Sequence, residues 1–243
     1  MNSREALRRL ADVTSTQWGL VTSAQAAARG VGRLELSRLT QSGHFVRLAK
    51  GVYKDSGAPG GSHLELRAAW LSTDPPRTVA ERLDDGPAGV VVCGESATRL
   101  HGIGDLRADR HEFNVISRRQ SQRPDIKYRQ RSLVASEVTI REGLPVTTVE
   151  RTLADLVADR HDLSLVADVL ADAVRQGVVN LDRLALRLGP LAERNGHERD
   201  DGDALLTRLL RIRGLDRDDI VAAQAALRGV RADNPRRTRG GAA

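Results

Sequence analysis

The stretch VGRLELSRLTQSGHFVRLAKGVYKD, residues 31–55, decides how the first part of this chain is interpreted. Residues 33–41 have helical spacing, and on a helical wheel Leu36 and Leu39 share one side. Polar and basic side chains occupy the other side, and Gly43 ends the run. The pattern predicts a short amphipathic helix that buries its leucines and exposes its polar side chains.

A β-hairpin is predicted directly after this helix. Residues 45–48 and 51–54 are short β-type runs, and Gly51 suits the left-handed position of a tight turn between them. Before the helix, residues 3–12 and 23–29 predict two further helices, separated by a short apolar segment. Helix, short strand, helix, helix and hairpin is the order of a winged helix-turn-helix.

The side chains that point away from the predicted core of this module suit duplex DNA. On the third helix they would enter the major groove, where arginine pairs with guanine and glutamine with adenine. Side chains of the hairpin and of the start of the second helix would contact phosphates. The predicted DNA-binding residues are Ser23, Gln25, Arg33, Ser37, Arg38, Gln41, Arg47, Lys50 and Lys54. A solvated basic face that binds protein is the alternative interpretation of this pattern.

The charge distribution favours DNA as the partner. The chain has 243 residues and a formal net charge of +6; residues 1–56 contribute +5 and residues 228–243 contribute +4, so the middle carries −3. Two of the three lysines, Lys50 and Lys54, fall in the one hairpin. A basic module on a slightly acidic chain is typical of polyanion binding. Aromatic residues make up only 2% of the chain, which argues against stacking of single-stranded bases.

Composition divides the chain into four predicted parts. These are a winged helix-turn-helix at residues 1–56, a glycine-rich linker at 57–61, an α+β domain at 62–227, and a basic, disordered tail at 228–243. In the α+β domain, β-type runs between residues 89 and 142 predict a small, mostly antiparallel sheet. The residues that follow predict a helical C-terminal half, so the predicted fold class is α+β.

Several classes of protein are excluded by the residues that are present. No stretch reaches the roughly 18 apolar residues of a membrane span, and the charged N-terminus has no apolar signal core, so a soluble cytoplasmic protein is expected. The single cysteine, Cys93, excludes an internal disulfide, and the histidines lack metal-ligand spacing. Ser96 does not form a nucleophile elbow, because Thr98 stands where glycine is required. We therefore expect no metal, no cofactor and no enzymatic activity.

One short pattern keeps an enzymatic alternative open. Asp125 and Lys127 lie two residues apart on a predicted strand, and Glu112 lies on the strand before it. Metal-dependent nucleases place two acids and a lysine in this way; the acids hold Mg²⁺ and the lysine steadies the attacking water or the phosphate. The alternative is therefore a metal-dependent nuclease-like protein with a winged-helix DNA-binding head. Alternating charges on an exposed strand produce the same pattern.

Three segments of the sequence resemble the AbiEi-type antitoxins, which are regulators of bacterial type IV toxin–antitoxin systems. They are WGLVTSAQAAARGVGRLELSRLTQSGHFVRLAKGVYKD (residues 18–55), CGESATRLHGI (93–103) and LPVTTVERTLADLV (144–157). The resemblance implies a transcriptional autorepressor that binds operator repeats in its own promoter. It also implies an antitoxin that counters, directly or indirectly, a nucleotidyltransferase-like toxin encoded beside it.

The resemblance further implies a division of labour between the two halves of the chain. The N-terminal domain would bind DNA, and the C-terminal domain would be needed to neutralise the toxin. We expect these two activities to separate at the linker, so that residues 1–56 bind operator DNA and residues 62–243 protect from the toxin. On paired repeats we expect a monomer or weak dimer that binds cooperatively.

Overall fold

The chain folds into two compact units. The structure, a computed structural model, describes residues 2–121 and 123–222, and the predicted tail at 228–243 lies outside these residues. Of the described residues, the first unit comprises those up to 100 and from 108 to 148, and the second comprises residues 101–107 and 149–222. Within the described residues, no helix is both long and apolar enough to cross a membrane.

The first unit begins with the winged helix-turn-helix, here called the head (residues 1–56). Its elements are α1 (Ser3–Thr16), β1 (Leu20–Thr22), α2 (Ser23–Ala28), α3 (Arg33–Gln41), β2 (Phe45–Ala49) and β3 (Val52–Asp55). The three strands form an antiparallel sheet in the order β1-β3-β2. Gly51 has a φ of +76°, which is the left-handed position expected in the hairpin turn. The predicted winged-helix order is confirmed.

Local sequence explains why these elements begin and end where they do. Thr22 caps α2 through its hydroxyl, and Gln25 returns a hydrogen bond to the backbone of Thr22, which completes a capping box. Leu36 and Leu39 of α3 are each 1% exposed. They pack with apolar residues of α1, including Leu10, in a small core of the head. The helical spacing of the leucines thus fixes which side of α3 faces outward.

The rest of the first unit is a five-stranded sheet with helices. Its elements are α4 (Leu64–Thr73), α5 (Val79–Leu83), β4 (Val91–Val92), α6 (Gly94–His101), β5 (His111–Val115), β6 (Ile126–Gln130), β7 (Val138–Arg141) and β8 (Leu144–Thr147). The strand order is β6-β5-β4-β8-β7. The pairs β4–β5 and β7–β8 are antiparallel, whereas β5–β6 and β4–β8 are parallel. The α+β class is confirmed; the sheet is more mixed than expected, because long connections allow parallel pairing.

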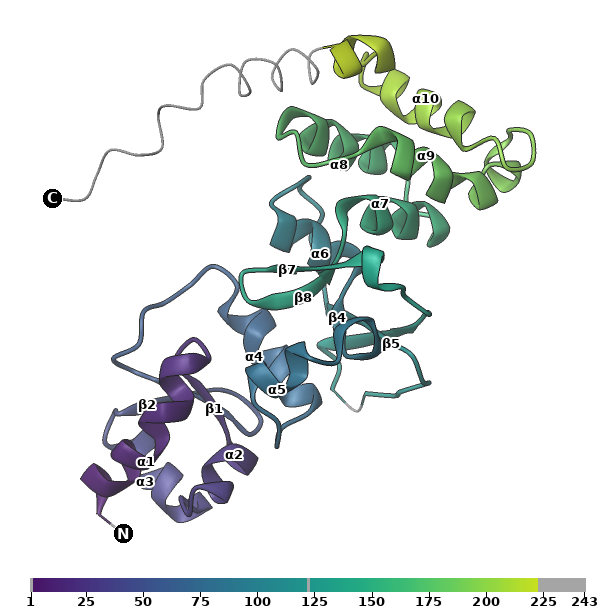
Figure 1. Cartoon of the computed structure of the whole chain (residues 1–243). Helices are drawn as coiled ribbons and strands as arrows, with labels where there is room; N and C mark the ends of the chain where they lie inside the picture. Colours follow the sequence, from purple (N-terminus) through teal and green to yellow (C-terminus); the bar gives the residue numbers. More distant parts are fainter. Residues whose placement is uncertain (1, 122, 223–243) are drawn as a thin grey trace, which may run out of the picture. The chain divides into compact units, whose positions relative to one another are not determined.

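The head and the five-stranded sheet share one hydrophobic core. Leu20 and Val52 of the head lie in the same buried cluster as Trp70 of α4 and Phe113 and Val146 of the sheet. Figure 1 shows α4 and α5 between the head and this sheet. The predicted linker therefore joins parts that are packed together, although its glycine-rich composition suggested a free joint.

The second unit is helical. It contains α7 (Val149–Ala158), α8 (Leu163–Arg175), α9 (Leu181–Leu188) and α10 (Gly202–Ile212), which lie beside one another in Figure 1. Apolar residues recur at helical spacing, and Leu153, Leu170, Leu184 and Leu206 are each at most 1% exposed in one core. The predicted helical C-terminal half is confirmed within the described residues.

Candidate nucleic-acid interface

The outward side of α3 carries the side chains predicted to read bases. Arg33, Ser37, Arg38 and Gln41 are all exposed. Ser37, Arg38 and Gln41 lie on the side away from the buried Leu36 and Leu39, and Arg33 lies at its flank. Within the described part of the chain, none of the four side chains makes an ion pair or a side-chain hydrogen bond. A helix of this size fits the major groove, and unpaired arginine and glutamine side chains can form bidentate bonds to base edges. The outward side of α3 therefore presents polar side chains with free hydrogen-bonding groups, within the described residues, and base contact by them stays a prediction.

Leu34 belongs to the same outward side of α3. It is 59% exposed, more than most large apolar side chains of the described chain. An exposed leucine among polar side chains on a recognition helix can contact the methyl group of thymine. On a helical wheel Leu34 falls among these polar side chains, so the sequence pattern could have marked it as a candidate contact.

The hairpin turn places a second set of basic groups beside α2. Lys50 is exposed at the turn, and the described residues offer its amino group no partner. Arg47 is exposed on β2, where its Nε makes only a long hydrogen bond of 3.4 Å to the carbonyl of Ala49. The Ser23 backbone amide donates to the Gly51 carbonyl at 2.8 Å, which ties the start of α2 to the turn. The turn that carries Lys50 is thus tied to Ser23, and phosphate contact by Arg47, Lys50 and Ser23 stays a prediction.

Two of the predicted DNA contacts, Gln25 and Lys54, form hydrogen bonds within the protein. Gln25 is 0% exposed, and its carboxamide bonds the Gln17 side chain and donates to the Arg77 carbonyl at 2.8 Å. Lys54 lies near the base of the hairpin, where its Nζ donates to the backbone carbonyls of Asp55 and Ala58 at 3.0 and 2.5 Å. The prediction that Gln25 contacts phosphate is wrong because the side chain is buried, and Lys54 stabilises the loop after the hairpin.

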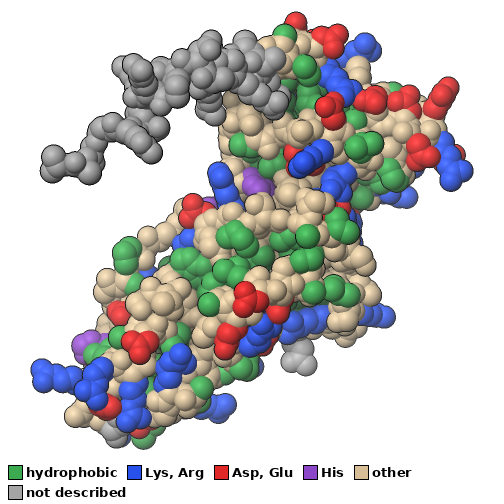
Figure 2. Space-filling model, in the orientation of Figure 1, with side chains coloured by type: hydrophobic (Ala, Val, Ile, Leu, Met, Phe, Trp, Pro, Cys, Tyr) green, Lys and Arg blue, Asp and Glu red, His purple; other side chains and the backbone are tan. Residues whose placement is uncertain are grey.

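Basic side chains gather around this candidate interface. Figure 2 shows Lys and Arg side chains over the N-terminal helices, at the lower left of the view. Part of this charge is already compensated, because Glu5 of α1 accepts from Arg9 at 2.9 Å and Arg8 at 2.6 Å. Among the residues that the structure describes, the arginines of α3 have no such acidic partner, so their charge is available to a polyanion.

The residues of the nuclease alternative form ion pairs. Glu112 and Lys127 lie opposite each other on the parallel strands β5 and β6, and Lys127 Nζ is 2.9 Å from the Glu112 carboxylate. The same carboxylate accepts from Arg129 at 3.0 Å and from the Glu95 backbone amide at 3.1 Å. Asp125 is bound instead by Arg123, whose Nε is 3.0 Å away. The two acids therefore have separate cationic partners.

This arrangement does not fit a metal site. Burial tends to raise the pKa of Glu112, but Lys127 and Arg129 outweigh that effect and lower it. The Arg123 side chain lowers the pKa of Asp125. Among the described residues, no group of three or more histidine, cysteine, aspartate or glutamate side chains could hold a metal ion. Glu112 and its partners connect β5, β6 and the start of α6, which is a structural role.

The hairpin of β2 and β3, which is the wing of the winged helix, allows a test of phosphate contact with a control residue in the same hairpin. The logarithm of the DNA association constant falls linearly with the logarithm of the salt concentration. We expect Lys50→Ala to make this slope shallower by about one unit, because one phosphate contact is lost. Lys54→Ala, in the same hairpin, should leave the slope unchanged because its amino group is held by backbone carbonyls. Fluorescence anisotropy over a salt series measures both slopes. Equal changes in the two variants would contradict this assignment of the wing.

The fold defines a class, the winged-helix transcriptional regulators with an α+β C-terminal part. Comparison with protein families places the chain within that class. Residues 3–53 match the family model described as transcriptional regulator, AbiEi antitoxin, and residues 90–199 match the AbiEi antitoxin C-terminal domain. Together the two matches cover more than half of the chain. The chain belongs to the AbiEi antitoxin family, which confirms the resemblance seen in its sequence.

A solved structure with a similar fold is the crystal structure of the RV2827C protein from Mycobacterium tuberculosis. The likeness covers 92% of this chain and 81% of that one, with a TM-score of 0.53 and 19% sequence identity. At this identity the likeness shows a shared fold. No curated protein matches the sequence.

Proposed function

We propose that this protein is a sequence-specific, double-stranded DNA-binding autorepressor that acts as the antitoxin of a type IV toxin–antitoxin system. The observation that carries the DNA-binding part is the outward side of α3, where Arg33, Arg38 and Gln41 have no protein partner in the described residues. The wing turn at Lys50 adds a phosphate contact beside this helix. Regulation then follows from occupation of the promoter, without catalysis.

The antitoxin part of the proposal rests on membership of the AbiEi family. The toxin it counters would be nucleotidyltransferase-like and encoded by the neighbouring reading frame. Operator repeats would be bound cooperatively by a monomer or weak dimer. Growth after co-expression with that toxin, with and without the full chain, measures the antitoxin activity apart from repression.

Arg38 provides the test of direct readout. Arg38→Ala should weaken binding to operator DNA by about tenfold or more, because a bidentate contact to guanine contributes about 1–3 kcal/mol of discrimination. Binding to unrelated duplex DNA should change far less, since only one positive charge is lost. Titration of both DNAs at one salt concentration gives the ratio of the two affinities.

A matched control separates base contact from charge. Arg8→Ala removes an equal charge from α1, where Arg8 pairs with Glu5, and should leave the ratio of operator to unrelated DNA unchanged. If Arg38→Ala weakens both DNAs equally, Arg38 is a phosphate contact. If it weakens neither, α3 is not the recognition helix.

A further inference from the structure

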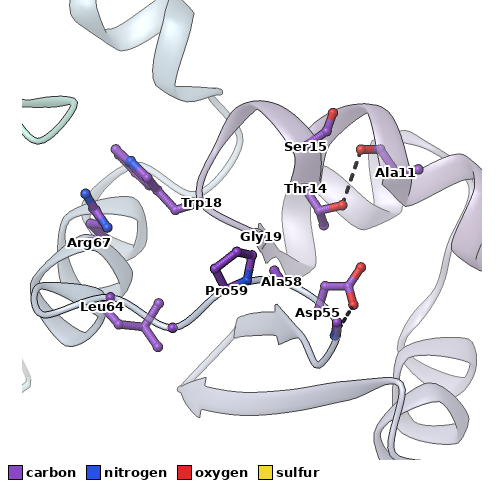
Figure 3. A pocket seen from close by; sticks show the side chains of 13 residues that line it. Ala11, Thr14, Ser15, Trp18, Gly19, Asp55, Ala58, Pro59, Leu64 and Arg67 are labelled. Atoms are coloured by element: carbon purple, nitrogen blue, oxygen red, sulfur yellow. Dashed lines mark hydrogen bonds between the residues drawn. The ribbon is translucent and has the colours of Figure 1, made fainter.

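A hollow of about 510 Å³ lies in the first unit at the end of α1. Its walls come from the last turn of α1, from the Trp18–Gly19 turn, from residues 57–61, and from the start of α4 (Figure 3). Trp18, Pro59 and Leu64 supply most of its large apolar side chains. Its size falls in the range of about 300–1,000 Å³ that is usual for small-molecule sites.

Contacts with neighbouring residues fix the position of Trp18, which forms one wall of this hollow. Trp18 has a φ of +58°, an uncommon conformation for a bulky residue that persists only where its surroundings impose it. The Arg67 guanidinium lies over the Trp18 ring, 4.9 Å from its centre. Gly143 also lies against the ring, since a Cβ on Gly143 would be 2.9 Å from Trp18 Cζ2. The aromatic surface is therefore preorganised.

Arg67 provides unused hydrogen-bond donors beside this surface. Its side chain is 11% exposed, and Nη2 donates to the Glu142 backbone carbonyl at 2.9 Å and to its carboxylate at 3.1 Å. Nε is buried without a partner, and Nη1 also has none among the described residues. Nη1 lies next to Gly61, one of the lining residues. An anionic acceptor entering the hollow would accept from Nη1, since hydrogen bonds between a guanidinium and a carboxylate are strengthened by their opposite charges.

The opposite wall of the hollow is fixed by Lys54. Its amino group donates to the carbonyls of Asp55 and Ala58, which holds the chain after the hairpin against the head. Gly19 and Ala58 approach so closely that a Cβ on Gly19 would be 2.2 Å from that of Ala58. The glycine-rich residues 57–61 therefore form a defined wall, which the Lys54 hydrogen bonds help to hold.

We propose that this hollow is a binding site for a small aromatic carboxylate. The flat apolar part would pack against Trp18, Pro59 and Leu64, and the carboxylate would accept hydrogen bonds from Arg67. The site lies apart from the outward side of α3, so its occupancy can be measured without DNA. The chain would then be a regulator that also responds to a small molecule.

The experiment uses the full chain and 2-naphthoate as the probe. The protein has two tryptophans, so its ¹H–¹⁵N spectrum contains two indole signals, one of which belongs to Trp70, buried with its Nε1 bonded to the Val90 carbonyl. Titration with 2-naphthoate should shift the Trp18 indole signal saturably and leave the Trp70 signal in place. We expect half-saturation at or below about 1 mM, within the range of weak ligand affinities.

Three comparisons decide between this site and a solvent-filled groove. The uncharged analogue 2-naphthylmethanol and the Arg67→Gln variant should each bind about tenfold more weakly, the loss expected for a charged hydrogen bond. Glu142→Gln keeps the guanidinium and removes a competing carboxylate, so it should bind at least as tightly as the native protein. Absence of a saturable Trp18 shift, or equal shifts with the charged and neutral probes, would overturn the proposal. Circular dichroism establishes that each variant is folded.

Discussion

Residues 1–56 expressed alone are expected to be largely unfolded and to lose most operator binding, whereas residues 1–148 are expected to retain both fold and binding. The reason is the shared core. In the fragment of residues 1–56, Leu20 and Val52 lose their contacts with the Trp70 cluster and become exposed. Exposing one such side chain costs about 1.5–3 kcal/mol, and a domain of this size has only a few kcal/mol of stability to lose.

Buried hydrogen bonds increase the expected loss. The Thr22 hydroxyl donates to the Pro75 carbonyl at 2.5 Å, and the Gln25 carboxamide donates to the Arg77 carbonyl. Both acceptors are absent from the shorter fragment. A buried polar group that loses its partner costs about 1–3 kcal/mol unless water replaces that partner.

Circular dichroism during heating measures whether each fragment unfolds cooperatively. Titration with operator DNA measures the affinity of each fragment. The full chain is the reference for both. Cooperative unfolding of residues 1–56, with an operator affinity equal to that of residues 1–148, would contradict the expectation. That result would support the division at the linker of residues 57–61 that composition favours. Loss of binding in both fragments would instead mean that the helical unit also contributes to DNA binding.

Glu112→Ala is expected to destabilise the first unit by about 3–5 kcal/mol, the usual cost of removing one partner from a buried ion pair. The Glu112 side chain is 5% exposed and pairs with Lys127 and with Arg129, whose side chain is only 13% exposed. Its loss removes the carboxylate that pairs with Lys127 and Arg129 and also removes the acceptor of the Glu95 amide at the start of α6. Urea unfolding of the full chain measures the change.

Asp125 supplies the matched control on the same sheet. Its side chain is 43% exposed and pairs with Arg123. Asp125→Ala should therefore lower the free energy of unfolding by only about 0–1 kcal/mol, the usual contribution of an exposed ion pair. If both substitutions leave stability unchanged and abolish a Mg²⁺-dependent cleavage of DNA, the nuclease alternative would be correct. If Glu112→Ala alone leaves stability unchanged, the ion-pair network is not structural.

The same carboxylate predicts how stability depends on pH. The pKa of Glu112 lies below its usual value of 4.5 in the folded protein, so the unfolded chain binds a proton more readily. Its contribution is therefore present above about pH 4.5 and is lost as the pH falls through the lowered pKa. The native protein should lose this stability in acid, and Glu112→Ala should show a weaker acid dependence.

Sequence alone determined the features of this protein that depend on near neighbours in the chain. The spacing of Leu36 and Leu39 identified the outward side of α3, because a helix places residues three and four apart on one side. Gly51 marked the hairpin turn, because its left-handed backbone suits glycine. Glu112, Asp125 and Lys127 were correctly placed on or beside neighbouring strands.

Only the tertiary structure decided which partner each polar side chain takes. Gln25 bonds the carbonyl of Arg77, 52 residues away, and this contact buries a side chain that the local pattern placed at a DNA surface. Strand register places Glu112 opposite Lys127 on the neighbouring strand, and this placement forms their ion pair. Likewise, Leu20 and Val52 join the core of the five-stranded sheet. Burial and pairing between distant residues arise from packing in three dimensions, which neither helical nor strand periodicity encodes.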